Sequence, residues 1–268
     1  MTHRLNALDR GDGVPLVALH GFPVDHELMS GCLEPVLSAR GGIRRLYPDL
    51  PGLGRSPGDG VSSTDDVLAR VEEFLDEAIG DAPFLLVGES FGGYLARAIA
   101  NRRRDRVLGL ALICPMGTAV ESHDRRVPPL EVRRSDPELV AGLDPAEAAD
   151  FTEIAVVQSP ETWRRFRAEI APGLSRADQA AVARIRSAYA LTSPPESDGP
   201  LLAPTLIVTG RQDNVTGYLD QWDLLEHYPH ASFAVLDVAG HNLQIERPTL
   251  LDALLVDWLD RVDGESRT

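Results

Sequence analysis

The chain of 268 residues contains no lysine, so all 26 of its basic residues are arginines. Without a side-chain amine, the protein cannot form a Schiff base. This excludes lysine-dependent aldolase chemistry and pyridoxal-phosphate chemistry. A phosphate-binding loop that carries its usual lysine is excluded for the same reason.

Cysteines and long apolar runs are also scarce. The two cysteines, Cys32 and Cys114, lie far apart in the sequence, which predicts two buried thiols and excludes a disulfide framework. No apolar run reaches the length that spans a membrane. The first ten residues, MTHRLNALDR, lack the apolar centre of a secretory signal. We therefore expect a cytoplasmic protein that has no membrane partner.

Acidic residues outnumber basic residues by 41 to 26, which gives a formal net charge of −15. This charge repels phosphate backbones, so we expect no nucleic-acid partner. The apolar share of 43% is ordinary for a soluble globular protein and allows a sizeable core. The length fits one α/β core that carries an insertion.

Apolar, β-rich runs alternate with helical patterns, which predicts an α/β fold with a parallel sheet and helices on both faces. Residues 4–8 and the turn-rich residues 9–13 suggest an antiparallel hairpin at the edge of the sheet. The expected strands are residues 14–19, 43–47, 83–87, 107–113, 204–209 and 232–238. The expected helices of the core are residues 25–39, 64–79, 91–101 and 248–262, the second of them capped by Ser63 or Thr64.

Between residues 117 and 200 the pattern changes, because no strand of that quality appears there. Helical stretches at 145–158, 160–170 and 175–190 occur instead, and a turn-rich segment follows them. We therefore expect a core domain made of residues 1–116 and 201–268, and a helical cap made of residues 117–200. The insertion leaves from the edge of the sheet where open α/β folds bind ligands, so it is well placed to act as a lid.

The sequence Gly88-Glu89-Ser90-Phe91-Gly92 matches the nucleophile elbow G-x-S-x-G. A five-residue match can occur by chance, but here a strand precedes the motif and a helical pattern follows at once. The glycines are needed because the serine sits on a tight, strained turn where larger neighbours would clash. The alternative interpretation of Ser90 is a helix-capping serine in a glycine-rich turn.

A serine nucleophile needs a base, and the base needs an acid that orients it. His241 is the candidate base because it lies in the loop after the last strand, whereas the positions of His3, His26, His123, His227 and His230 fit the role less well. Asp213 is the candidate acid because it directly follows the strand 204–209. The order Ser, Asp, His is the one expected for this elbow. Asp220 and Asp223 are nearby alternatives for the acid, expected in the next helix and solvated.

An oxyanion hole requires two backbone N–H groups. Phe91, which follows the nucleophile, should supply one of them. Phe22, in the loop after the first central strand, should supply the other, since Pro23 has no N–H. Such a site needs no metal and no organic cofactor, and its expected partner is a small-molecule substrate.

These motifs resemble those of the α/β-hydrolase superfamily over nearly the whole chain. HGFP, DLPGLGRS, GESFGG, GRQDNV and AGHNLQIERP follow one another in the family's order. The resemblance implies a mostly parallel, eight-stranded sheet, a helical cap inserted after the sixth strand and an acyl-serine intermediate. It assigns the nucleophile, acid and base to Ser90, Asp213 and His241, and the oxyanion donors to Phe22 and Phe91.

Carboxylic esters are the expected substrates, since they suit an unspecialised triad. A second possibility is a carbon–carbon bond in a dienoic ring-fission product. Hydrolases of that branch usually carry Asn before the nucleophile and Trp after the histidine, where this chain has Glu89 and Asn242. Ser90 excludes the aspartate-nucleophile branches, and the absence of lysine excludes the plant-type hydroxynitrile lyases. A third possibility is a binding protein without turnover, because a fold does not fix a function.

The sequence leaves the substrate-binding residues and the oligomeric state open. Glu89 is either a structural hydrogen-bond acceptor or a pocket residue. Arginines of the insertion are candidates for binding a substrate carboxylate, although such charge runs are more often a solvated helix face. These arginines are Arg125, Arg126, Arg133, Arg134, Arg164, Arg165 and Arg167.

Overall fold

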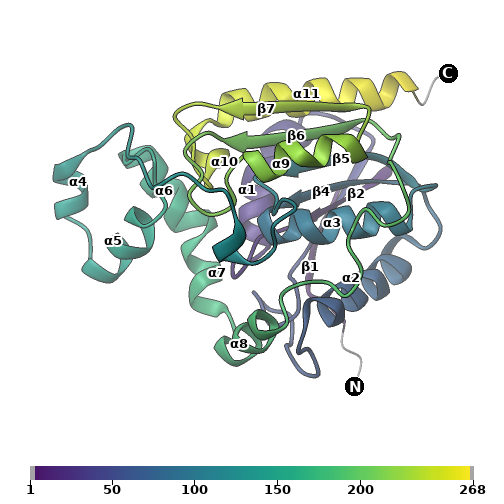
Figure 1. Cartoon of the computed structure of the whole chain (residues 1–268), viewed down its shortest axis with the longest axis horizontal. Helices are drawn as coiled ribbons and strands as arrows, with labels where there is room; N and C mark the ends of the chain where they lie inside the picture. The colour runs from purple at the N-terminus through teal and green to yellow at the C-terminus, as the bar shows by residue number, and fades with distance from the viewer. Residues whose placement is uncertain (1–3, 266–268) are drawn as a thin grey trace.

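A computed structural model describes residues 4–265 of the chain (Figure 1). One seven-stranded sheet forms its centre, in the order β1-β3-β2-β4-β5-β6-β7. All neighbouring strands run parallel except β1, which is antiparallel to β3. The strands are β1 (Ala7–Arg10), β2 (Val14–Leu19), β3 (Ile43–Pro48), β4 (Phe84–Glu89), β5 (Val107–Ile113), β6 (Thr205–Gly210) and β7 (Ala231–Leu236).

The expectation of eight strands is therefore wrong, because residues 4–265 contain seven. The expectation of an N-terminal hairpin is also wrong. β1 pairs with β3, with Ala7 opposite Pro48 and Arg10 opposite Arg45. β2 has β3 and β4 as parallel neighbours, so β1 cannot pair with β2 in a hairpin and adds to the outer edge of β3 instead. Residues 4–13 contain one short strand and a bend at Gly13, which leaves no length for another strand before β2.

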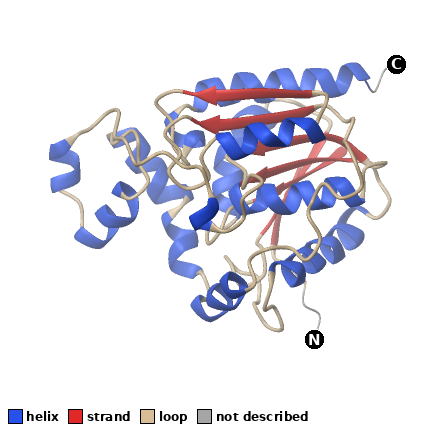
Figure 2. Cartoon of the chain, in the orientation of Figure 1, coloured by secondary structure: helices blue, strands red, loops and turns tan. Residues whose placement is uncertain are grey.

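Helices cover both faces of the sheet, as Figure 2 shows. The helices α1 (His26–Leu37) and α11 (Pro248–Glu265) pack on one face, and α2 (Thr64–Ile79) and α3 (Ser90–Arg102) lie on the other.

The central strand β4 contributes to the cores on both faces. Phe84 and Leu86 belong to the core beneath α2 and α3, whereas Leu85 and Val87 belong to the core beneath α1 and α11. Successive side chains of a strand point to opposite faces. The continuous apolar run of β4 follows from this double burial.

Ser63 caps α2, as one of the two sequence alternatives predicts, and its side chain accepts the N–H of Asp66 at 3.1 Å. Beside it, the hydroxyl of Thr64 donates to the carbonyl of Tyr189 at 2.7 Å. The start of α2 is thereby joined to the segment that precedes β6.

The segment between β5 and β6 is helical, and α4 and α5 project away from the sheet at the left of Figure 1. Its helices are η1 (Ser122–Asp124), α4 (Pro137–Ala141), α5 (Pro145–Thr152), α6 (Pro160–Glu169), α7 (Ala171–Arg176) and α8 (Gln179–Ser187). The helix expected over 145–158 ends at Thr152, because the N–H groups of Val156 and Val157 bond to the side chain of Glu246. The stretch expected over 175–190 contains the end of α7 and a separate α8, because Asp178 caps a new helix.

Three short elements complete the core: α9 (Leu219–Trp222), η2 (Asp223–His227) and α10 (Leu243–Glu246). The loops that follow β2, β4, β5, β6 and β7 all leave from the carboxyl ends of parallel strands, so they meet at one edge of the sheet. Among residues 4–265, no helix combines the length and the apolar character needed to cross a bilayer.

Candidate active site

Ser90 lies on the tight turn between β4 and α3, and its φ of 51° is in the left-handed region. Two glycines make this turn possible. A Cβ atom on Gly92 would lie 2.2 Å from the carbonyl oxygen of Leu19, and one on Gly88 would lie 2.5 Å from that of Gly92. The turn therefore has the geometry that the G-x-S-x-G motif predicts.

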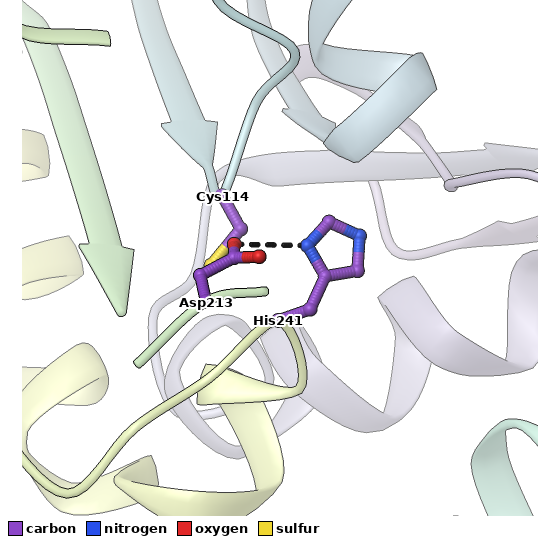
Figure 3. Close-up of side chains that lie close together, drawn as sticks. All are labelled: Cys114, Asp213 and His241. Atoms are coloured by element: carbon purple, nitrogen blue, oxygen red, sulfur yellow. Dashed lines mark hydrogen bonds and ion pairs between the residues drawn. The ribbon is translucent and has the colours of Figure 1, made fainter. Parts of the chain in front are cut away.

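His241 bridges the other two predicted triad residues. Its Nε2 lies 2.9 Å from Ser90 Oγ, and its Nδ1 lies 2.9 Å from Asp213 Oδ2 (Figure 3 shows the second contact). Asp213 is fully buried, while Ser90 and His241 keep 7% and 8% of their surface exposed. The loops after β4, β6 and β7 thus bring all three residues together, with only the serine and the histidine open to a substrate.

The carboxylate of Asp213 is held by the residues that follow it. Its Oδ1 accepts the N–H groups of Val215 at 2.8 Å and Thr216 at 2.9 Å. Its Oδ2 accepts the hydroxyl of Thr216 at 2.8 Å. Burial would raise the pKa of Asp213, but His241 and these donors bring the pKa below its usual value, so the carboxylate stays ionised. Sequence reasoning missed Thr216, although a threonine three residues after an aspartate is a recognisable turn pattern.

Cys114 lies behind this carboxylate in Figure 3. Its thiol is buried at the end of β5 and donates to the carbonyl of Gly240 at 3.6 Å. Burial and the charge of Asp213 raise the pKa of the thiol well above its usual value, so it stays protonated. Ligand atoms of Cys114, Asp213 and His241 are close enough to hold a metal ion, but a protonated thiol is a poor ligand and the other two residues bond to each other.

A second group with ligand spacing comprises Asp25, His26 and Asp49. Asp49 accepts the side chains of Asn6 at 2.7 Å and His26 at 2.8 Å. Asp25 caps α1 and accepts from Arg176 at 2.7 Å. These partners account for the buried carboxylates, and the cluster ties the loop before α1 to the loop after β3.

Glu89 fits both alternatives that the sequence leaves open, because it lines the cavity beside the base and its carboxylate also accepts the backbone N–H of Gly21. It is 2% exposed, and its Oε1 lies 3.4 Å from His241 Nε2. Burial raises the pKa of Glu89 to about 7. Burial alone would lower the pKa of His241, but the charges of Asp213 and Glu89 together with the Asp213 hydrogen bond raise it to about 9.

The two residues predicted to supply the oxyanion donors lie close to each other. Phe91 stands in the first turn of α3, where backbone N–H groups have no partner within the helix. Phe22 lies in the loop after β2, and the ring centroids of Phe22 and Phe91 are 5.3 Å apart. His20 anchors that loop: its Nδ1 donates to the carbonyl of Gly21 at 2.7 Å and its Nε2 accepts the N–H of Leu50 at 2.9 Å.

A cavity of about 700 Å³ opens onto these residues. Ser90, His241 and Glu89 form part of its wall, and both the core and the inserted segment contribute to the lining. The apolar lining residues are Phe22, Pro23, Val24, Leu28, Met116, Val127, Ile154, Phe166, Ile170, Leu174, Tyr189 and Val215. The charged lining residues are Glu89, Glu121, Arg125, Asp150, Glu153, Arg186 and His241 when protonated.

Of the seven candidate arginines, Arg125 alone lines this cavity. Its guanidinium donates to the carbonyl oxygens of Val120 and Val215, the latter at 3.1 Å. Arg165 binds Glu169 and the carbonyl of Gln244, so it joins α6 to the core. Sequence reasoning missed Arg186, which lines the cavity with its guanidinium 5.7 Å from the centre of the Phe22 ring.

Arg126 instead holds the two alternative acids. The guanidinium of Arg126 binds Asp220 and Asp223, and the backbone N–H of Arg126 donates to Asp220 at 3.0 Å. Asp220 is buried, so the expectation that it is solvated is wrong. Its carboxylate is occupied by this pairing, whereas that of Asp213 faces His241.

Glu246 fixes the loop that carries His241. One carboxylate oxygen accepts the N–H of Gly240 at 2.6 Å, and the other accepts the N–H groups of Val156 and Val157 at 2.7 and 3.0 Å. Sequence reasoning missed this role too, although Glu246 stands within the motif AGHNLQIERP. One buried side chain thus connects the base to the inserted segment.

Comparisons with known proteins agree with this geometry. A family model described as alpha/beta hydrolase fold matches residues 14–248. The chain is 27% identical over 289 residues to a 2-hydroxymuconate semialdehyde hydrolase of Pseudomonas putida, covering 98% of this chain and 92% of that protein. It is 26% identical over 266 residues to a monoacylglycerol lipase of Bos taurus, covering 92% of this chain and 75% of that protein.

A solved structure also shows similarity to alpha/beta hydrolases. An alpha/beta superfamily hydrolase from Oenococcus oeni PSU-1 has a TM-score of 0.90 and 29% identity to this chain, covering 98% of this chain and 97% of that one. It matches the core and the inserted segment together, since the shared region is nearly the full length of both chains. Because the family model also spans most of the sequence, the chain belongs to the alpha/beta hydrolase fold family.

Proposed function

We propose that this protein is a serine hydrolase that cleaves a carboxylic ester of a small molecule through an acyl-serine intermediate. The observation that carries the proposal is the position of His241, whose two ring nitrogens lie 2.9 Å from Ser90 Oγ and 2.9 Å from Asp213 Oδ2. A serine hydroxyl is a poor nucleophile at neutral pH and needs such a base. The cavity that opens onto Ser90 gives a substrate access to it.

In the acylation step, Ser90 Oγ attacks the ester carbonyl carbon and its proton passes to His241 Nε2. Asp213 keeps Nδ1 protonated and stabilises the imidazolium that forms. The N–H groups of Phe22 and Phe91 stabilise the oxyanion. When the tetrahedral intermediate collapses, the bond to the alcohol oxygen breaks and His241 returns its proton to that oxygen.

In the deacylation step, water attacks the acyl-enzyme. His241 takes a proton from the water, and the oxygen of the water bonds to the acyl carbon. Collapse of this second intermediate releases the carboxylic acid and returns the proton to Ser90 Oγ. All groups for both steps come from the chain, so the proposed mechanism requires no metal and no organic cofactor.

We further propose that residues 117–200 act as a cap over a core made of residues 1–116 and 201–268. In support, the inserted segment lines the cavity with Phe166, Leu174 and Arg186 from three of its helices, and with Ile154 and Tyr189 from the segments that follow α5 and α8. A cap of this kind excludes water from the ester and selects the substrate by shape. The apolar half of the lining suits a neutral ester with an apolar acyl or alcohol group.

The likeness to the hydrolase of Pseudomonas putida favours one second candidate, hydrolysis of a carbon–carbon bond next to a dienoic acid. Against it stands the pocket itself. Glu89 occupies the position next to the nucleophile, where its carboxylate would repel the carboxylate of such a substrate. Arg125 already donates to two backbone carbonyls, and Arg186 lies at the exposed rim of the cavity.

The test is covalent trapping with a fluorophosphonate probe, followed by a substrate panel. We expect one adduct on the wild-type protein, at Ser90, and none on Ser90→Ala or His241→Ala. We expect p-nitrophenyl esters of short and medium acids to turn over faster than a dienoate ring-fission product. Faster turnover of the dienoate would favour the second candidate. A folded wild-type protein that gives neither an adduct nor ester turnover would overturn the proposal in favour of a binding protein.

A further inference from the structure

The ester mechanism needs one carboxylate beside His241, but two carboxylates flank its ring. Asp213 lies on the Nδ1 side at 2.9 Å, and Glu89 lies on the Nε2 side at 3.4 Å. Nε2 is also the atom that faces Ser90 Oγ. A charge on Glu89 therefore acts on the nitrogen that carries the proton in transit.

The other end of the same carboxylate lies against the loop that bears the oxyanion donor Phe22. A Cβ atom on Gly21 would stand 2.1 Å from Glu89 Oε2, so any larger residue at this position would displace the carboxylate from its present place. The backbone N–H of Gly21 faces the carboxylate as well and lowers its pKa against the larger, raising effect of burial. His20 fixes the same loop from behind through the carbonyl of Gly21.

Glu89 is nearly fully buried, so its position is set by the fold rather than by solvent. It is the last residue of β4, and its backbone pairs with Ile113 of β5. The strained turn at Ser90 begins directly after it. The elbow therefore presents two side chains to the cavity from adjacent positions, the nucleophile and a carboxylate.

From this geometry we propose that Glu89 is a positioning residue that couples the base to the oxyanion loop (residues 20–23). One carboxylate oxygen holds the Nε2 edge of His241 beside Ser90, and the other holds the backbone of Gly21. The negative charge strengthens His241 as a base and stabilises the imidazolium from the side opposite Asp213. This inference rests on the proposed function, since it assigns Glu89 a part in the same reaction.

Several other ionisable groups lie near Glu89 and His241, and those that are charged also act on the pKa of His241 that the experiment measures. Asp213 acts on both His241 and Glu89, and the positive charge of Arg125 lowers the pKa of His241. Cys114 and Tyr189 lie near the Glu89 carboxylate, but burial raises both of their pKa values and keeps both neutral. Glu89 is therefore the group, besides Asp213, whose removal changes the charge at the imidazole most directly.

The experiment compares Glu89→Gln with the wild type by titration of ¹⁵N-labelled histidine in NMR, with His241→Ala assigning the His241 signals. Because an opposite charge at this distance favours the protonated ring, we expect the His241 midpoint in Glu89→Gln to fall by about one pH unit or more. The acid limb of kcat/KM for a p-nitrophenyl ester should move to lower pH by the same amount. Glu73→Gln removes an equal charge from the surface of α2 and should move neither midpoint.

A His241 midpoint in folded Glu89→Gln that matches the wild type would overturn the proposal. If Glu89→Gln does not fold, the wild-type titration decides alone: we expect the His241 signals to show two inflections, one from each group, and a single inflection overturns the coupling. The NMR titration needs no substrate. Absence of ester turnover would therefore count against the proposed function, while an unchanged midpoint would count against Glu89 alone.

Discussion

The hydroxyl of Thr216 donates to Asp213 Oδ2 at 2.8 Å, and the hydroxyl oxygen of Thr216 also lies 3.4 Å from His241 Nδ1. The hydroxyl thus stands at the junction of the acid and the base. Asp213 Oδ2 accepts two hydrogen bonds, one from Thr216 and one from His241. This arrangement fixes the direction in which the carboxylate faces the imidazole, and it keeps a fully buried charge supplied with donors.

Thr216→Val should therefore lower kcat for an ester substrate by about tenfold, because a hydrogen bond to a charged group contributes about 1.5 kcal/mol or more. KM should change little, since Thr216 does not line the cavity. The matched control is Thr209→Val on β6, another buried threonine, whose hydroxyl contacts the carbonyl of Ala234 at 3.4 Å. If both variants lose activity equally, a general packing defect explains the loss better than the contact with Asp213.

The pH profile of the wild type is a second prediction. The pKa of His241 is raised to about 9 in the free protein, and the base acts only when the ring is neutral. A raised pKa keeps the ring protonated to higher pH, so kcat/KM should rise with pH between 7 and 9, with an acid-limb midpoint well above 6.5. Stopped-flow measurement with a p-nitrophenyl ester from pH 6 to 10 checks this. A midpoint at or below 6.5 would contradict the balance of charges described for His241.

Much of this site can be read from the sequence because its key residues follow strands directly. Ser90, Asp213 and His241 each follow the carboxyl end of a strand, and the strands are parallel, so these ends meet at one edge of the sheet. The elbow glycines add a steric reason that is local to the motif. Local pattern and global topology agree at these positions, which is why the order of the motifs predicts their convergence.

Other features depend on contacts between distant segments and leave no local pattern. The strand β1 pairs with β3 because both sides of β2 are occupied by β3 and β4. The helix α5 stops early because Val156 and Val157 find an acceptor in Glu246, which is 90 residues from Val156. The direction of the Glu89 side chain depends on the space that Gly21 leaves, and Gly21 lies far from Glu89 in the sequence.

A third prediction concerns Glu246. In Glu246→Gln one of the two carboxylate oxygens becomes an amide nitrogen, which cannot accept a hydrogen bond. At least one buried N–H, that of Gly240 or those of Val156 and Val157, then loses its partner. We expect the free energy of unfolding to fall by about 2 kcal/mol. We also expect kcat to decrease, since the loop that holds His241 loosens.

Urea unfolding and ester kinetics measure these two effects. Glu226→Gln is the control, because Glu226 is exposed and its nearest partner is the ring of His227 at 3.6 Å. The control should stay within about 0.5 kcal/mol of the wild type. Equal stability of the two variants would show that the hydrogen bonds of Glu246 do not hold the loop.

The fourth prediction tests the packing of the elbow. In Gly92→Ala the new methyl group would stand 2.2 Å from the carbonyl oxygen of Leu19 and 2.5 Å from that of His20. Both acceptors belong to the backbone at the end of β2, so neither can move without displacing the oxyanion loop. We expect a loss of about 3 kcal/mol in the free energy of unfolding, as for severe overpacking, together with loss of fluorophosphonate labelling at Ser90. Gly41→Ala is the control, because a Cβ atom there meets nothing within 4 Å. Wild-type labelling and stability in Gly92→Ala would mean that the carboxyl end of β2 and the start of α3 can separate, and a preformed oxyanion hole would then be untenable.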